Sequence, residues 1–324
     1  MQPCRLRVVS LLAVQPSPQP PSECRWSPDH ESCANEEIRI AVVGLGGRGG
    51  VHIASFGGQK GVRIIAVCDP DRHRLSAAAK SVESRFKYRP DEVVDVRKLM
   101  ERKDSDAISV ATMQHWHALP TIWACQTGRH VYVEKPLAHF IWEGRQMVNA
   151  ARKHGRLVQV GTQYRSVSAY AMMAQWLREG HLGKIQYATC LANKPRQSIG
   201  KHTEPLPIPP TLDYDFWCGP ARKEPVYRDR LQYDCSFTWN MGDGESCNQG
   251  VHEVDVARWI LGDAGLPRRT MSVGGRFIVN DAGDVWKLEQ TPRPWSSDEQ
   301  VGSAIGSLFH VYREQGYSTK QTDS

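Results

Sequence analysis

Short apolar runs alternate with longer amphipathic segments over the first half of the chain. The runs are rich in β-branched residues and predict strands at 38–43, 62–68, 107–111, 130–133 and 157–161. The segments between them predict helices at 71–86, 91–102, 117–127 and 140–154. Continuous apolar strands are typical of a parallel sheet that is buried on both faces, and repeated strand–helix units predict right-handed crossovers. We therefore expect an α/β fold whose first domain, residues 37–164, is a doubly wound parallel sheet of the Rossmann type.

The pattern changes at about residue 165, where we place the start of a second domain, residues 165–284. The pattern there predicts helices at 168–180 and 247–261, strands at 184–193 and 271–279, and a proline-bearing loop from 194 to 241. After Asp284 the β alternation fades and branched residues become few, so residues 285–324 are expected to be an atypical tail.

The first 36 residues contain the proline-rich stretch QPSPQPPSE, which is typical of a disordered leader. Arg5 and Arg7 precede the short apolar run VVSLLAV. We expect a cytoplasmic protein, and export by a signal peptide stays open as the alternative.

A glycine cluster follows the first predicted strand. Gly44, Gly46 and Gly49 match G-x-G-x-x-G at a strand-to-helix turn. In such a turn the first glycine allows the tight bend, the second leaves room for a pyrophosphate, and the third lets helix and strand pack closely. The free amides at the helix start and the helix dipole favour the anion. The alternative is an ordinary glycine-rich turn of another α/β protein.

Asp69 ends the second predicted strand, 25 residues after Gly44. A carboxylate in this place can bind both ribose hydroxyls of NAD and would repel the 2′-phosphate of NADP. Together with the glycine turn, Asp69 predicts that the first domain binds NAD.

Composition narrows the classes of protein to which the chain can belong. Its 324 residues, 40% hydrophobic and 23% charged, suit a globular protein of two domains. The net charge of +6 comes from scattered arginines without a long basic run, so no nucleic-acid partner is expected. No apolar run approaches about 18 residues, so we expect no membrane span. Nine cysteines at irregular spacing, without a C-x-x-C pair, favour reduced thiols over a disulfide framework or a zinc site.

Ligands of doubly wound sheets bind at the carboxyl ends of the strands, and three polar clusters fall there. They are QHWH (114–117), EKP (134–136) and TQYR (162–165). Lys135 can donate hydrogen bonds to a substrate hydroxyl and stabilise a developing alkoxide. The alternative for Lys135 is an exposed surface lysine.

The other polar residues of these turns are candidates for cofactor binding. We assign Arg48 of the glycine turn, His117, Glu134 and Gln163 to this group. His115 and His117 have no matching set of carboxylates or cysteines nearby in the sequence, so we expect no metal site.

Asn248, His252, Asp255 and Trp259 share one face of the helix predicted near the end of the second domain. A polar stripe within an otherwise apolar helix is unusual for a packing face. His252 is a candidate general base, because an ordinary imidazole titrates near neutral pH. Asp255 is a candidate to orient His252 or to bind a substrate hydroxyl. The alternative is a solvated helix face.

These motifs together resemble the glucose–fructose oxidoreductase / inositol dehydrogenase / MocA (Gfo/Idh/MocA) family, in its bacterial branch of NADH-dependent dehydrogenases. The resemblance covers roughly residues 37–280 and rests on GLGGRG, Asp69, ATMQHWHALP, VYVEKPLA, VGTQYR and NQGVHEVDVARWILG. It implies a second α/β domain with an open, mainly antiparallel sheet, through which subunits commonly associate into a homo-oligomer. It also implies hydride exchange between NAD and a sugar or cyclitol carbon. Lys135 would then lie beside nicotinamide and substrate, and His252 would accept the hydroxyl proton.

Two departures from the family pattern stand out. Many members have an aspartate four residues before the histidine, where this chain has Asn248, which carries no negative charge. Asp255 is the candidate to compensate for it. Members also continue with several more strands, so we expect an incomplete sheet, and we interpret the sequence after Asp284 as the result of a frameshift or truncation.

The sequence leaves three functions open. The first is an NAD-dependent dehydrogenase that acts on a small carbohydrate or cyclitol. The second is an NAD-dependent glycosidase that uses transient oxidation, against which the EKP lysine argues. The third is a catalytically impaired nucleotide-binding protein.

Overall fold

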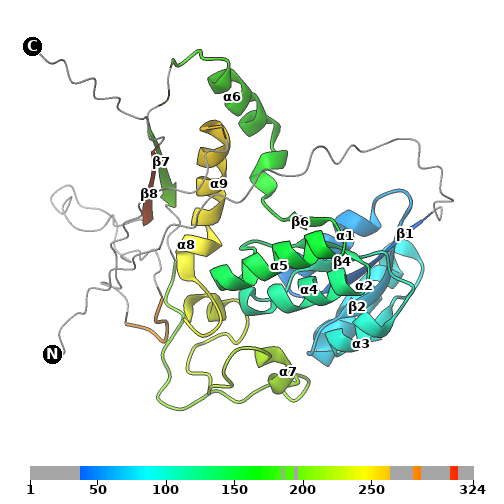
Figure 1. Ribbon diagram of the computed structural model, residues 1–324. Helices are drawn as coiled ribbons and strands as arrows, with labels where there is room; N and C mark the ends of the chain where they lie inside the picture. Colours follow the sequence, from blue (N-terminus) through cyan, green and yellow to red (C-terminus); the bar gives the residue numbers. More distant parts are fainter. Residues whose placement is uncertain are drawn as a thin grey trace, which may run out of the picture.

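The computed structural model describes residues 37–183, 185, 187–192, 196–262, 280–285 and 307–312. The expected leader and the strand expected at 271–279 lie outside these residues, as does most of the expected tail. Two parts are visible in Figure 1: a sheet covered by helices, and a smaller part built around two long helices and a pair of strands.

The first part contains a six-stranded sheet in which every neighbouring pair is parallel. Its strands are β1 (Ile38–Val43), β2 (Val62–Cys68), β3 (Asp91–Val93), β4 (Ala107–Val110), β5 (His130–Val133) and β6 (Val158–Val160). Their order is β3-β2-β1-β4-β5-β6, so the strand order reverses between β1 and β4. This is the order of a Rossmann fold, in which the ligand lies at that reversal. The predicted fold class of the first domain is confirmed.

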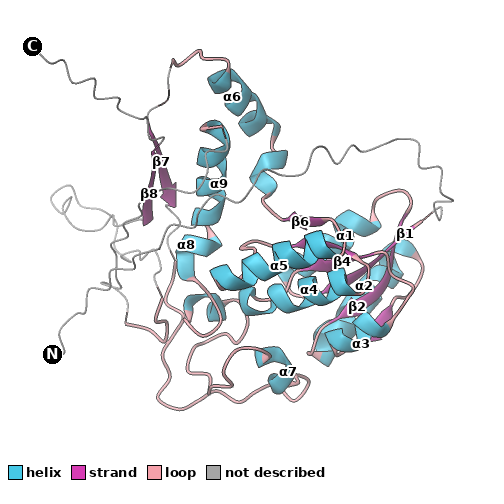
Figure 2. Ribbon diagram, in the orientation of Figure 1, coloured by secondary structure: helices cyan, strands magenta, loops and turns pink. Residues whose placement is uncertain are grey.

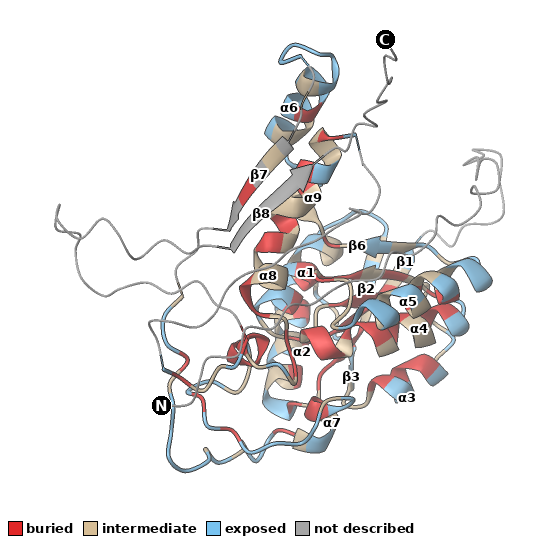
Figure 3. Ribbon diagram, turned by 60° about the vertical axis from the view of Figure 1, so that its left-hand side comes forward, coloured by how far each residue is buried: buried red, intermediate tan, exposed pale blue. Residues whose placement is uncertain are grey.

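Helices cover both faces of this sheet (Figure 2). They are α1 (Gly47–Gly57), α2 (Arg72–Phe86), α3 (Val96–Glu101), α4 (Ala118–Gln126) and α5 (Ile141–Lys153). Ile40 and Val42 of β1 pack with α1 and α2 on one face, while Ala41 and Val43 pack with α3, α4 and α5 on the other. Figure 3 shows the strands as the buried layer between these helices. Burial on both faces explains why the central strands β1, β2 and β4 are mainly apolar, whereas the edge strand β3 is Asp91–Val93 and largely exposed.

The segment predicted as one helix at 91–102 is instead a short strand followed by a short helix. Asp91–Val93 pairs in parallel with the end of β2 and forms the edge of the sheet. Asp95 then caps α3, because its side chain accepts a hydrogen bond from the Arg97 amide. The first three residues of this segment form a strand because they pair with the open edge of β2, although their sequence pattern is helical.

The second part is described less completely. It contains α6 (Ser168–Arg178), β7 (Tyr187–Ala192), α8 (Gly244–Asn248), α9 (Gly250–Ile260) and β8 (Ser307–Tyr312). The helix predicted at 247–261 begins instead at Gly250, with the short helix α8 before it. β8 pairs with β7 in antiparallel register, Tyr187 opposite Tyr312. β8 lies within residues 285–324, where the sequence pattern predicted no strand, because its partner β7 is far away in the sequence.

The loop between β7 and α8 packs against the Rossmann domain. It carries α7 (Tyr214–Cys218) and a core of Leu212, Trp217, Cys218, Cys235 and Met241, with Met113 of the first domain packed on it. The Arg72 amide donates to the Thr211 carbonyl over 2.9 Å, and the Asp213 amide donates to the Pro70 carbonyl over 3.1 Å. These bonds place the loop over the carboxyl ends of β1 and β2, where a ligand of this fold would bind.

None of the helices in the described parts of the chain is both long and apolar enough to cross a membrane.

Candidate active site

The glycine turn has the geometry that its sequence predicts. Gly44 has φ +85°, and a Cβ there would lie 2.6 Å from the Thr112 amide nitrogen. A Cβ on Gly49 would lie 2.0 Å from the Gly44 carbonyl oxygen, so this glycine allows α1 to approach the turn. A Cβ on Gly46 would meet only an Arg74 nitrogen, at 3.7 Å. Gly46 thus borders open space at the start of α1, which fits a pyrophosphate.

Asp69 is buried beside this turn. One carboxylate oxygen accepts the Leu45 amide over 2.8 Å and the other accepts the Asp71 amide over 2.9 Å. Burial raises the pKa of Asp69, and these two hydrogen bonds oppose that rise. Each oxygen keeps a further lone pair with which it can accept from a ribose hydroxyl.

Two adjoining cavities lie along the carboxyl ends of the strands. The smaller, about 110 Å³, lies beside Asp69 and under Trp217 of the loop. The larger, about 630 Å³, extends from Gly46 past Lys135 to Asn248. Both are lined by Gly46, Arg74, Ala111, Thr112, Met113 and Gln232. Their continuity fits a dinucleotide whose adenosine end lies at Asp69 and whose nicotinamide end lies at Lys135.

The buried carboxylate of Glu134 is held by the exposed Arg48 and by the buried His52. One of its carboxylate oxygens accepts from Arg48, at 2.5 Å from Nη2, and lies 2.9 Å from His52 Nε2. Burial alone would raise the pKa of Glu134, but the hydrogen bonds from His52 and Arg48 outweigh it and leave the pKa at about 2. Glu134 is therefore a carboxylate at all ordinary pH values, and Arg48 is fixed at the wall of the larger cavity.

Lys135 lines the larger cavity next to this carboxylate. Its ammonium donates to the backbone carbonyl of Asn248, and to the Asn248 side-chain oxygen over 3.1 Å. Burial lowers the pKa of Lys135, with opposition from the charges of Glu134 and Glu245. An ammonium can only donate, so the Asn248 amide must turn its oxygen toward Lys135 and its nitrogen away. That nitrogen is buried without a hydrogen-bond partner among the described residues, which leaves a donor for a ligand.

His252 and Asp255 do not line either cavity. The His252 ring stacks on Tyr164 with centroids 4.7 Å apart, and its Nδ1 is buried without a partner among the described residues. Burial, and then the charge of Lys135, lower the pKa of His252 to about 4. Asp255 forms a bidentate ion pair with Arg165, at 2.8 and 2.9 Å, and its described hydrogen bonds do not include His252. The sequence did not predict Arg165 as the partner of Asp255.

His117 and Gln163 occupy different places at the strand ends. His117 lines the larger cavity but is 1% exposed, and its two ring nitrogens lie 2.6 Å from the Pro136 carbonyl and 3.1 Å from the Thr112 carbonyl. It therefore joins the turn after β4 to the EKP turn. Gln163 lies outside both cavities, although its buried side-chain oxygen has no partner within the described chain.

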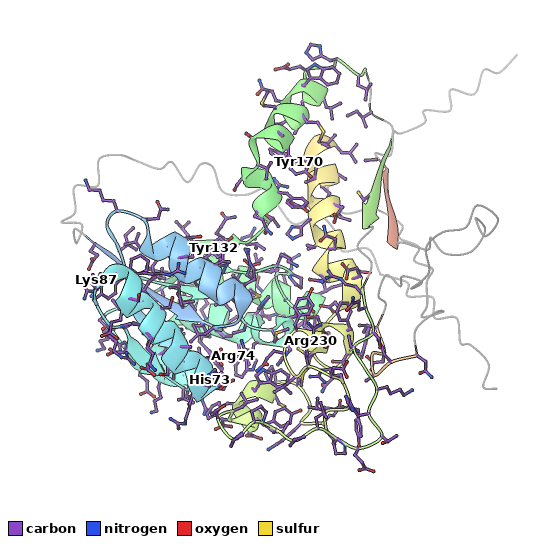
Figure 4. The ribbon with its side chains drawn as sticks, turned by 180° about the vertical axis from the view of Figure 1, so that it is seen from behind. His73, Arg74, Lys87, Tyr132, Tyr170 and Arg230 are labelled. Atoms are coloured by element: carbon purple, nitrogen blue, oxygen red, sulfur yellow. The ribbon has the colours of Figure 1, made fainter. Side chains whose placement is uncertain are left out.

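Several lining residues carry no motif and were not predicted. Arg74, in the first turn of α2, lines both cavities and donates to Gln232 of the loop over 3.0 Å. Figure 4 shows Arg74 on α2 and Arg230 on the loop. The five-residue spacing from Asp69 to Arg74 was a signal that could have been used, because an arginine near this carboxylate can reach a nucleotide phosphate. The loop residues had no such signal, since only the packing of the loop brings them to the cavity.

Comparisons with known proteins agree with this geometry. Residues 38–162 match the family described as "Oxidoreductase family, NAD-binding Rossmann fold", and residues 182–290 match its "C-terminal alpha/beta domain". The chain thus has an NAD-binding Rossmann domain followed by an oxidoreductase-type α/β domain. It belongs to the Gfo/Idh/MocA family, as the motifs indicated.

Individual relatives are distant. Over 154 residues the chain is 26% identical to a glycosyl hydrolase family 109 protein of Shewanella sp. (strain MR-4), and 25% identical to an alpha-N-acetylgalactosaminidase of Shewanella oneidensis. Each match covers 46% of this chain and 34% of the relative, so the matched segment spans about a third of the relative's length.

Two solved dehydrogenases share the fold. The WlbA dehydrogenase from Bordetella pertussis, in complex with NADH and UDP-GlcNAcA, is 23% identical with a TM-score of 0.50, over 69% of this chain and 58% of that chain. The WlbA dehydrogenase from Chromobacterium violaceum is 24% identical with a TM-score of 0.50, over 70% of this chain and 56% of that chain.

Proposed function

We propose that this protein exchanges a hydride between NAD and a hydroxyl-bearing carbon of a sugar or cyclitol. The observation that carries the proposal is Lys135, a partly buried amine at the wall of a large cavity that is continuous with the glycine turn. Gly46 leaves the space for a pyrophosphate, and Asp69 faces the smaller cavity with free acceptor capacity. When bound, NAD would supply the hydride acceptor, held by the glycine turn, Asp69, Arg48 and Glu134.

Lys135 is the residue that we assign to proton transfer. Its lowered pKa increases the fraction of neutral amine, which can take the proton of a substrate hydroxyl as that carbon is oxidised. In the reverse direction the ammonium donates the proton back. Asn248 holds the amine in place through its oxygen, while its free amide nitrogen can donate to the same substrate oxygen.

His252 plays a supporting part in this scheme. With a pKa of about 4 it is neutral at physiological pH, and it lies behind the cavity wall against Tyr164. A neutral ring adds no further positive charge beside Lys135, whose pKa is already lowered by burial and by the charges of Arg196 and Arg48. The role of proton acceptor that the resemblance gives to His252 is therefore secondary to Lys135 in our proposal.

A substrate screen tests the function directly. Purified protein would be mixed with NAD and a panel containing myo-inositol, D-glucose, D-galactose and N-acetyl-D-galactosamine, and absorbance would be followed at the nicotinamide band. We expect net formation of NADH with at least one member. NAD binding in calorimetry, with neither turnover of any sugar or cyclitol nor NAD-dependent cleavage of a glycoside, would reject the dehydrogenase and support a nucleotide-binding protein.

The second candidate function is an NAD-dependent glycosidase, which the glycosyl hydrolase relatives favour. That reaction would release an alcohol from a glycoside without net NADH. Hydrolysis of p-nitrophenyl N-acetyl-α-D-galactosaminide that requires NAD, with no NADH among the products when they are separated by chromatography, would support it over net oxidation.

We also propose that the partners are a small carbohydrate or cyclitol and a second copy of the chain. The antiparallel pair β7–β8 provides the described start of a sheet through which copies could associate. Light scattering after size-exclusion chromatography tests this, since a strictly monomeric mass would contradict it.

A further inference from the structure

Tyr233 has an unusual position in the wall of the larger cavity. It lies in the loop that covers the cofactor-binding edge, lines the cavity and remains 44% exposed. Its backbone has φ 68° and ψ −54°, a region that a bulky L-residue rarely adopts. Such strain costs on the order of a kcal/mol or more, and it persists where surrounding contacts hold it, often at functional sites.

The tyrosine hydroxyl is held by a charged pair behind the wall. Arg196 donates from Nη1 to the Tyr233 hydroxyl over 2.9 Å. The same guanidinium forms a bidentate ion pair with Glu245, at 2.8 and 2.9 Å, and Glu245 is 0% exposed. Arg230 lies over the Tyr233 ring, 5.7 Å from its centroid. The ring and its hydroxyl therefore have a fixed place.

A guanidinium has only donors, so the hydroxyl oxygen must accept this hydrogen bond. The proton of the hydroxyl is then left to donate elsewhere, and the described hydrogen bonds give it no acceptor within the protein. A buried ion pair adds little net stability, because desolvation offsets most of the attraction. A strained tyrosine and a buried pair that orients it are better explained by binding than by folding.

We propose that Tyr233 is a substrate-binding residue that selects for a polyhydroxylated ring. This inference rests on the proposed function, since it concerns the substrate of the same cavity. The hydroxyl donates to an oxygen of the sugar or cyclitol, and the aromatic ring packs against the C–H face of the substrate. Arg196 and Glu245 are positioning residues that act through the hydroxyl.

The test compares Tyr233→Phe with a matched control, Tyr227→Phe. Tyr227 is an exposed tyrosine of the same loop that lines neither cavity. The substrate is the panel member with the highest turnover, and its binding to NADH-loaded protein is also measured by calorimetry. For Tyr233→Phe we expect KM and the calorimetric Kd to rise about tenfold, with kcat within about twofold and NADH affinity unchanged. Tyr227→Phe should match the wild type.

Arg196→Lys keeps a cation beside Glu245 but loses the planar guanidinium that binds Glu245 and the Tyr233 hydroxyl at the same time. Like Tyr233→Phe, it should raise KM without changing NADH affinity. Urea unfolding would confirm that each variant is folded. If the wild type binds a panel member and Tyr233→Phe binds it equally well, this inference is overturned while the proposed function stands. If the wild type binds no sugar or cyclitol, both are overturned.

Discussion

The glycine turn allows stability and cofactor binding to be separated by single substitutions. In Gly49→Ala the new Cβ would lie 2.0 Å from the Gly44 carbonyl oxygen, whereas real Cβ contacts are essentially never under 3.0 Å. The carbonyl or the start of α1 must therefore move by at least 3.0 − 2.0 = 1.0 Å. In Gly46→Val the new Cβ meets no backbone atom within 4 Å, since its one neighbour at that distance is the flexible end of Arg74 at 3.7 Å.

Gly49→Ala should therefore lose stability as well as affinity. Overpacking of this kind costs about 1–3 kcal/mol. At about 2–4 °C per kcal/mol, a mid-range cost of about 2 kcal/mol lowers the melting temperature by about 4–8 °C. Gly46→Val should keep the melting temperature of the wild type and lose detectable NAD binding, because its branched side chain fills the space for the pyrophosphate.

Thermal unfolding followed by near-UV circular dichroism and NAD titration by calorimetry would measure the two effects on the same samples. Gly47→Ala and Gly50→Ala are matched controls, since a Cβ at either position has nothing within 4 Å. Wild-type NAD affinity in Gly46→Val would show that this turn does not bind the phosphates. Wild-type melting of Gly49→Ala would show that α1 and the turn are not in the close contact described.

Three further predictions concern the two ends of the cavity. Lys135→Met should slow oxidation by about a hundredfold to ten-thousandfold, the usual contribution of a positioned general base, while calorimetry shows unchanged NAD affinity. A near-wild-type rate would exclude Lys135 from catalysis. Because burial lowers the pKa of Lys135, kcat/KM for oxidation should rise with pH and reach half its maximum below pH 10.5. Asn248→Asp should move that midpoint to higher pH, because it places a negative charge beside the amine. An unmoved midpoint would assign the titration to another group. Wild-type protein should bind NAD more tightly than NADP, and Asp69→Ala should reduce this difference in affinity, because the carboxylate would no longer repel a 2′-phosphate. Equal affinities in the wild type would contradict this prediction and would point to Arg74 as a phosphate ligand.

Local sequence determined most of the Rossmann domain. Apart from β3, its strands appear as mainly apolar runs, which can be recognised without knowledge of their neighbours. Gly44 has φ +85°, and Gly49 packs against the Gly44 carbonyl within the same turn, so the motif predicted the geometry of this turn from local sequence. β3 was missed because only three residues pair with the edge of β2, and an edge strand of that length leaves little pattern.

Tertiary structure decided which polar residues meet. The predicted helix 247–261 placed Asn248, His252 and Asp255 on one face. In the structure Asn248 ends α8 and contacts Lys135, whereas on α9 His252 stacks on Tyr164 and Asp255 pairs with Arg165. A helical repeat fixes the direction of a side chain but not the element that it meets. The loop is the clearest case: Tyr233 is brought to the cavity by packing against the Rossmann domain and by an ion pair between Arg196 and Glu245, 49 residues apart. Contacts over such distances depend on the whole fold, so no local pattern in the sequence records them.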